Sequence, residues 1–210
     1  MGLFGLSKNV KLQIENELKF VVCSGFFSEL TILVNAQETM EEICECNGVR
    51  MPSERYCLSF LEKMKKKYIA PGANNENFNK LNKVFEQLNE ENIIAVHYAD
   101  YNNGSEISRV YELLQEIKEE GKQSEGYCVY HEYDVERAME TGVLYLMYGC
   151  HNADDTQTIT KMGERIVALL REQGFDAAIN KEVAEEIIIN NFVWDKVYDG
   201  KYYAGNRSGE

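Results

Sequence analysis

The chain has 210 residues, 44% of them hydrophobic, so a sizeable folded core is expected and general disorder is excluded. The net charge of −13 disfavours direct binding to nucleic acid, because Lys and Arg that neutralise phosphates supply most of that affinity. Its apolar runs are far shorter than the roughly 20 residues that span a bilayer, so no membrane segment is expected.

Two helices are predicted at the start of the chain. In the first, apolar side chains recur at helical spacing after a Ser7 cap, and Gly25 lies where a helix-ending glycine belongs. The second is expected over 28–46, although the run TILV at 31–34 could also begin a strand.

Two more helices are predicted before residue 92. Pro52 and Ser53 open the third, which must end before Pro71. An Asn- and Gly-rich loop follows, and then a fourth helix with its apolar face made of Phe78, Leu81, Phe85 and Leu88.

From residue 93 the pattern changes to short apolar runs rich in β-branched and aromatic residues, which is typical of strands. The predicted strands are 93–98, 126–131, 143–149, 175–180 and 186–192. Amphipathic helices are predicted from Ile107, Val110, Tyr111, Leu114 and Ile117, closed by Gly121, and over 159–170, closed by Gly174. The link from Glu132 to Gly142 barely reaches the dozen or so residues that a parallel crossover needs.

This order of elements predicts an α/β fold, with α+β as the alternative. A helical N-terminal region over 1–92 precedes an α/β domain over 93–210, whose mixed, partly parallel sheet of about five strands is flanked by helices. Charge divides in the same way, since 1–92 carries 11 basic and 13 acidic side chains, whereas 93–210 carries 11 and 22.

The segment GYCVYHEYDVERAMETGVLYLMYG at 126–149 resembles an uncharacterised bacterial family, a domain of unknown function. The flanking FEQLNEENIIAVHY and GERIVALLREQGF segments, and CSGFF near the start, are similar to it as well. The resemblance runs from about Glu15 to Trp194. It implies a bacterial cytoplasmic origin and a shared fold, and it implies no reaction and no catalytic residues.

All three histidines lie at or just beyond the ends of predicted strands, namely His97, His131 and His151. If these strands are parallel neighbours, their imidazoles meet at one sheet edge, where open α/β folds place ligands. Acidic residues follow each histidine: Asp100, then Glu132 and Asp134, then Asp154 and Asp155. Imidazole with carboxylate serves both acid–base catalysis and metal binding.

Structural explanations compete with each of these functional ones. Asp134 suits a helix N-cap, and a histidine at a strand end is often only hydrogen-bonded and half-buried. Cys44 and Cys46 lack the further ligands of a zinc site, so no metal is predicted. Trp194 begins an aromatic tail that either covers the sheet edge or binds a partner, and coverage is favoured.

Two functions remain open. The first is a non-catalytic, acidic interaction protein, adaptor- or immunity-like, whose partner is a basic protein and which needs no cofactor. The alternative is a hydrolase or transferase with a His/carboxylate site at the strand ends. The start MGLFGLSKNV lacks the features of a secretory signal, and six cysteines are present, so a cytoplasmic protein with free thiols is expected.

Overall fold

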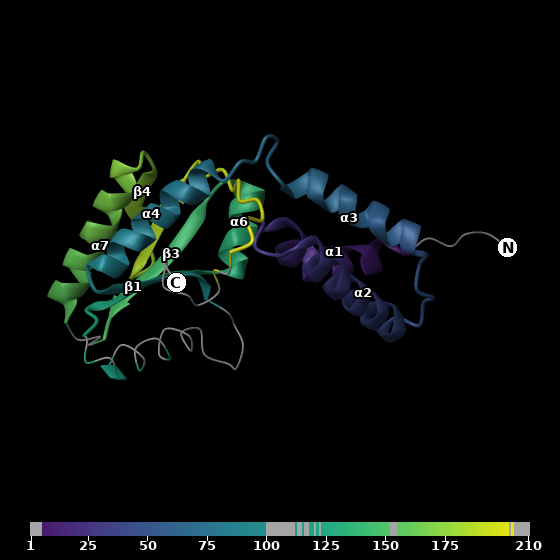
Figure 1. Cartoon of the computed structure of the whole chain (residues 1–210), viewed down its shortest axis with the longest axis horizontal. Coiled ribbons are helices and arrows are strands. Elements are labelled where there is room, and N and C mark those ends of the chain that lie inside the picture. Colours follow the sequence, from purple (N-terminus) through teal and green to yellow (C-terminus); the bar gives the residue numbers. More distant parts are fainter. Residues whose placement is uncertain are drawn as a thin grey trace.

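The computed structural model describes residues 6–99, 123–151 and 155–201, together with residues 112, 115, 118, 119, 121 and 203. Its elements, in chain order, are α1 (Lys8–Cys23), α2 (Glu29–Cys46), α3 (Glu54–Tyr68), α4 (Glu76–Glu90), β1 (Ile93–Ala99), β2 (Gly126–His131), α6 (Glu132–Thr141), β3 (Leu144–Cys150), α7 (Thr156–Glu172), β4 (Asp176–Ile179) and β5 (Glu186–Asn190). Figure 1 shows two lobes, one made of α1–α3 and the other of the sheet with its helices. None of the helices in this described part is long and apolar enough to cross a membrane.

Serine caps begin the first two helices as their sequences predict. The Ser7 hydroxyl accepts a hydrogen bond from the Val10 amide at 3.3 Å, and the Ser28 hydroxyl accepts one from the Thr31 amide at 3.1 Å. These bonds satisfy amides that have no partner inside the helix. The segment 28–46 is therefore a helix, and the TILV run lies within it.

The helical lobe has a hydrophobic cluster of its own. Both α2 and α3 pack on α1, which runs through the middle of the lobe. The buried members are Leu6, Val10, Ile14, Leu18, Val22, Cys23, Ile32, Ala36, Met40, Ile43, Cys44, Leu61 and Met64. The fourth helix, α4, belongs instead to the core of the sheet, with Phe78, Leu81 and Phe85 buried there.

The sheet is mixed, with strand order β1-β2-β3-β5-β4. β1 and β2 are parallel, and every other neighbouring pair is antiparallel. All five predicted strands form, and the shared sheet of 93–98 and 126–131 is confirmed. The link 132–142 is taken up by the helix α6, too short a connection to carry the chain across to a parallel strand, so β3 returns antiparallel beside β2.

Helices cover the sheet in two places. α4 and α7 contact each other and pack on one face, α4 against β1 and α7 against β3 and β4. α6 contacts β2 and β3 and also α1, so it lies between the sheet and the helical lobe. The helix predicted from Ile107 to Ile117 rests on five apolar residues that lie outside the described residues.

The segment 191–201, which follows β5, joins the lobes without forming a helix or strand. After β5, the Phe192 amide donates to the Gly142 carbonyl at 2.8 Å. The indole of Trp194 then donates to the Ser24 carbonyl, at the end of α1, at 2.9 Å. Gly25 lies directly against this segment, because an added Cβ would be only 2.2 Å from the Lys196 carbonyl oxygen.

Candidate interaction groove

The predicted histidine site is divided by the direction of β3. Because β1 and β2 are parallel and pair Ala99 with His131, His97 and His131 lie toward the same edge of the sheet. β3 runs the other way and pairs Cys150 with Gly126, so His151 lies at the opposite edge, about 16 Å along the sheet. The three imidazoles therefore do not converge, and Asp100 lies outside the described residues.

His97 is a core residue with both ring nitrogens engaged. Nδ1 is 2.8 Å from the Tyr130 hydroxyl, and Nε2 is 2.9 Å from the Asn82 side-chain oxygen. The ring stacks on Phe85 with centroids 4.5 Å apart. Burial lowers the pKa of His97 to about 3, and the charge of Lys196 acts in the same direction, so the imidazole is neutral at physiological pH.

His131 and Asp134 form the start of α6. His131 is the N-cap residue, and Asp134 occupies the third helical position of a capping box, where its carboxylate accepts from the His131 amide at 2.9 Å. The prediction that Asp134 is the N-cap is wrong. The helix already begins at Glu132, so the N-cap is His131, about one turn before Asp134. Burial raises the pKa of Asp134, and the hydrogen bond from His131 opposes that shift.

Trp194 is buried and packs on the hydrophobic core of the sheet. It contacts the rings of Phe26, Phe78, Tyr130 and Phe192, with centroids about 6 Å apart. With its indole N–H bonded to Ser24, the side chain has no face left for a partner protein.

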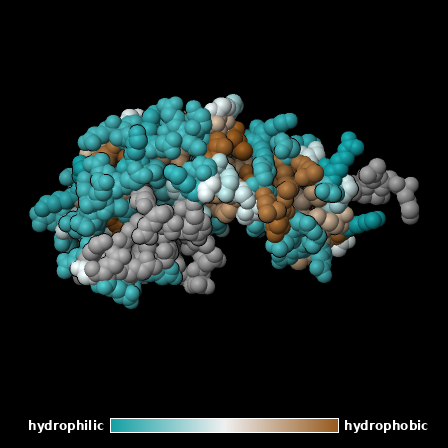
Figure 2. Space-filling model, in the orientation of Figure 1, coloured by the Kyte–Doolittle hydropathy of each residue, from teal (hydrophilic) through white to brown (hydrophobic). Residues whose placement is uncertain are grey.

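A different feature stands out on the helical lobe: an open groove of about 650 Å³ between α2 and α3. Its lining is Leu30, Leu33, Val34, Ala36, Gln37, Glu41, Met51, Pro52, Glu54, Cys57, Leu58 and Leu61. Figure 2 shows hydrophobic surface gathered on this lobe between α3 above and α2 below.

The groove exists because α2 is apolar on two faces. One face, which includes Ile32, Ala36 and Met40, is buried in the cluster with α1. The second presents Leu30 and Leu33, whose side chains are 73% and 42% exposed. A single apolar stripe is enough to hold a surface helix on its core, and the second stripe remains largely exposed in the described residues.

The ends of the groove differ in charge. α2 and α3 run antiparallel, since Lys65 near the end of α3 bonds Glu29 at the start of α2, with Nζ–O distances of 2.7 and 2.9 Å. At the other end the charged lining residues are both carboxylates, Glu41 and Glu54, and both are exposed.

Comparison with known proteins gives a family. A family model described as "Domain of unknown function (DUF6891)" matches residues 7–198. The chain belongs to this family. No curated protein matches the DUF6891 chain, and neither does any solved structure. The resemblance noted in its sequence is thereby confirmed, and the match covers both lobes together with the first part of the segment that follows β5.

The groove residues of this DUF6891 chain were missed by reading the sequence for a single apolar face. Leu30 and Leu33 indicate a helix together with Met40 and Cys44, yet the first pair is exposed and the second pair is buried. The available indication was an excess of apolar positions in α2, more than one stripe of a helix can hold.

Proposed function

We propose that this protein is a non-catalytic binding protein that takes an amphipathic helix of another protein into the groove between α2 and α3. The observation that carries the proposal is the mostly apolar lining of the groove, on a lobe that already has a hydrophobic cluster of its own. Helix-in-groove recognition uses such a surface, with apolar anchors about one helical turn apart.

The dimensions of the groove suit a short helix. Its wall on α2 runs from Leu30 to Glu41, which corresponds to roughly 16 Å, or about three helical turns. Four large side chains of the lining are substantially exposed: Leu30 by 73%, Leu33 by 42%, Val34 by 47% and Leu58 by 44%. Covering them would remove apolar surface from water, which is the main source of stability in such complexes.

The environment of the histidines also favours binding over catalysis. His97 is neutral, buried and hydrogen-bonded at both nitrogens, and His151 lies at the far edge of the sheet from His131. The six thiols are free, which suits the reducing cytoplasm of a bacterium, where we place the protein.

Selection from a displayed library of amphipathic helical peptides, with the purified full chain as target, tests the proposal. We expect peptides with leucine-like anchors at i, i+3, i+4 and i+7 to be enriched. Their binding should fall at least about tenfold with Val34→Asp, because a carboxylate placed in the apolar lining loses hydration when the groove is covered.

A matched control exists elsewhere on the surface. Val183 is 50% exposed, close to the 47% of Val34, and lies outside the groove, so Val183→Asp should leave binding unchanged. Circular dichroism melts should show both variants folded. If no enriched peptide distinguishes Val34→Asp from Val183→Asp, the groove is not the binding site.

A further inference from the structure

The charge of the groove specifies the chemistry of its occupant, and this inference rests on the proposed function. Glu41 accepts a hydrogen bond from Gln37 at 3.0 Å, and within the described residues neither it nor Glu54 has a basic side chain within 4 Å. Two carboxylates thus flank one end of the groove with no ion-pair partner within 4 Å in the described residues. They attract a cation and repel an anion at that end.

No residue that lines the groove is basic, so a second copy seated there brings no cation from its own groove. In a two-fold pairing of α2 with α2, the opposite end of the groove would face Glu41 and Glu54. Beyond the lining at that end, Glu29 and Lys65 already neutralise each other in an ion pair at 2.7 Å. Self-association would therefore bury apolar surface and leave the two carboxylates unmatched.

We propose that the occupant is a helix of a different protein that carries lysine or arginine next to one end of its apolar stripe, seated against Glu41 and Glu54. The apolar stripe supplies affinity, and the basic end selects the partner and sets the direction in which its helix lies. Like-charged helices are rejected, because an acidic end would face two carboxylates beside a poorly hydrated channel.

The test uses synthetic helical peptides that share one leucine stripe and carry a pair of Lys, Gln or Glu residues at one end or the other. Their affinity for the full chain is measured by fluorescence anisotropy at low and high salt. We expect the better Lys peptide to bind about five to thirty times more tightly than the Gln peptide, as two rim ion pairs would give, and the Glu peptides to bind most weakly. Added salt should narrow these differences.

Variants of the protein assign the effect to the groove. In the double variant Glu41→Gln, Glu54→Gln, the Lys and Gln peptides should bind alike. Glu42 and Glu45 lie on α2, as Glu41 does, are exposed and do not line the groove, so Glu42→Gln, Glu45→Gln is the matched control and should keep the preference. The charge reversal Glu41→Lys, Glu54→Lys should shift the preference to the Glu peptide.

The outcomes separate this inference from the proposed function. If Lys and Gln peptides bind the wild-type protein equally, the charge selection is wrong and the apolar groove still stands as the binding site. If no peptide of any charge binds, the proposed function itself is overturned. A concentration-dependent dimer in sedimentation velocity that Val34→Asp abolishes would assign the groove to a second copy and overturn both.

Discussion

His97 shows how one buried polar residue is accommodated in an aromatic core. A neutral imidazole has one donor and one acceptor, and here each has a partner on a different element, Tyr130 on β2 and Asn82 on α4. Burial raises the pKa of Tyr130 well above its usual value, so the phenol keeps its proton and can donate to the ring. The residue therefore fixes α4 against the sheet.

This neutrality gives stability a pH dependence. The unfolded chain binds a proton at His97 below about pH 6.5, whereas burial lowers the folded pKa to about 3, so the stabilisation is complete above pH 6.5 and declines as pH falls toward 3. In His97→Gln, the free energy of unfolding should fall less steeply between pH 6 and pH 4, by up to about 1.4 kcal/mol per pH unit. Urea denaturation at a series of pH values measures this slope.

His151 provides the control for that measurement. His151 is exposed, and partial desolvation together with the charge of Lys118 lowers its pKa; because the imidazole keeps contact with water, His151→Gln should change the slope much less. Equal slopes for the wild type and His97→Gln would mean that the imidazole of His97 titrates normally in the folded protein.

At the scale of elements, α4 is capped from a distant part of the chain. Its N-cap residue Asn75 has left-handed backbone geometry and provides no side-chain cap. Instead the carboxylate of Asp195 accepts from the amides of Asn77 at 2.9 Å and Phe78 at 3.0 Å. Negative charge at this position also complements the positive end of the helix dipole.

Removing this charge should destabilise the protein without changing the fold. Asp195→Asn replaces one acceptor oxygen by an NH₂ group that faces a backbone amide, which should cost about 1–3 kcal/mol of unfolding free energy. Asp176→Asn alters an exposed carboxylate on the edge strand β4 and should cost less than about 0.5 kcal/mol. Chemical denaturation of the two variants should separate them; similar values would show that the Asp195 cap contributes nothing.

The elements differ in how far the sequence could predict them. Ser7 and Ser28 cap their own helices, so the starts of these helices can be predicted from a few neighbouring residues. Asp195 acts on a helix that starts more than a hundred residues earlier, and no local pattern reveals such a contact. The direction of β3 was also hard to predict, because strand pairing depends on contacts between distant residues. Only the short link 132–142 argued against a parallel β3, and the predicted histidine site required one.

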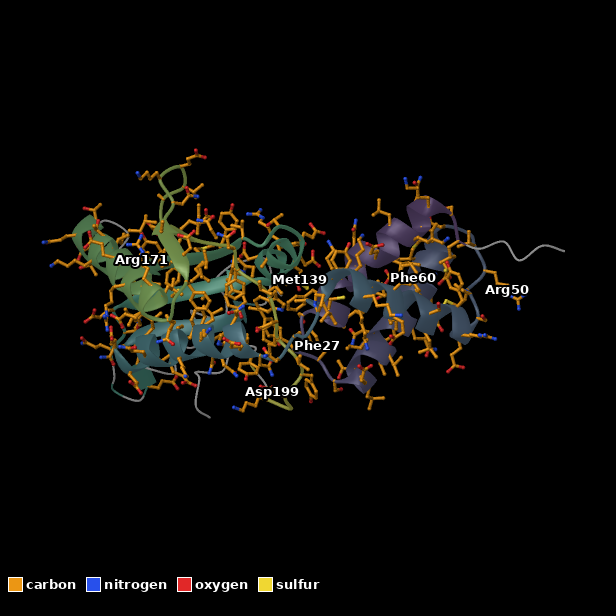
Figure 3. All side chains as sticks on the ribbon, turned by 90° about the horizontal axis from the view of Figure 1, so that it is seen from above. Phe27, Arg50, Phe60, Met139, Arg171 and Asp199 are labelled. Atoms are coloured by element: carbon orange, nitrogen blue, oxygen red, sulfur yellow. The ribbon has the colours of Figure 1, made fainter. Side chains whose placement is uncertain are left out.

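At the scale of the whole molecule, two hydrophobic clusters meet at a narrow joint. Phe27 and Met139 pack against both clusters, and Figure 3 shows them between the lobes. Beside them, the buried ammonium group of Lys19 on α1 bonds Glu140 on α6 at 2.7 Å and lies 3.7 Å from Glu136. Together with the Trp194 hydrogen bond to Ser24, these contacts orient the groove-bearing lobe relative to the sheet.

Lys19 is expected to control how firmly the lobes are joined. Lys19→Met keeps most of the side-chain volume but leaves the half-buried Glu136 without its cation. Burial already raises the pKa of Glu136 and Lys19 opposes this, so the carboxylate should become harder to ionise. Amide hydrogen exchange should then speed up roughly tenfold in α6 and the end of α1, and remain unchanged in β3 and β5.

The exposed pair Lys80–Glu76 on α4, 2.8 Å apart, is the matched control, because it has the same chemistry within one helix. Lys80→Met should alter exchange only locally, since exposed pairs contribute less than about 1 kcal/mol. Uniformly faster exchange across the sheet in Lys19→Met would indicate global destabilisation, and unchanged exchange in α6 would show that the other contacts between the lobes hold the joint without the ion pair. A selective increase would instead establish that the ion pair holds α6 against the end of α1.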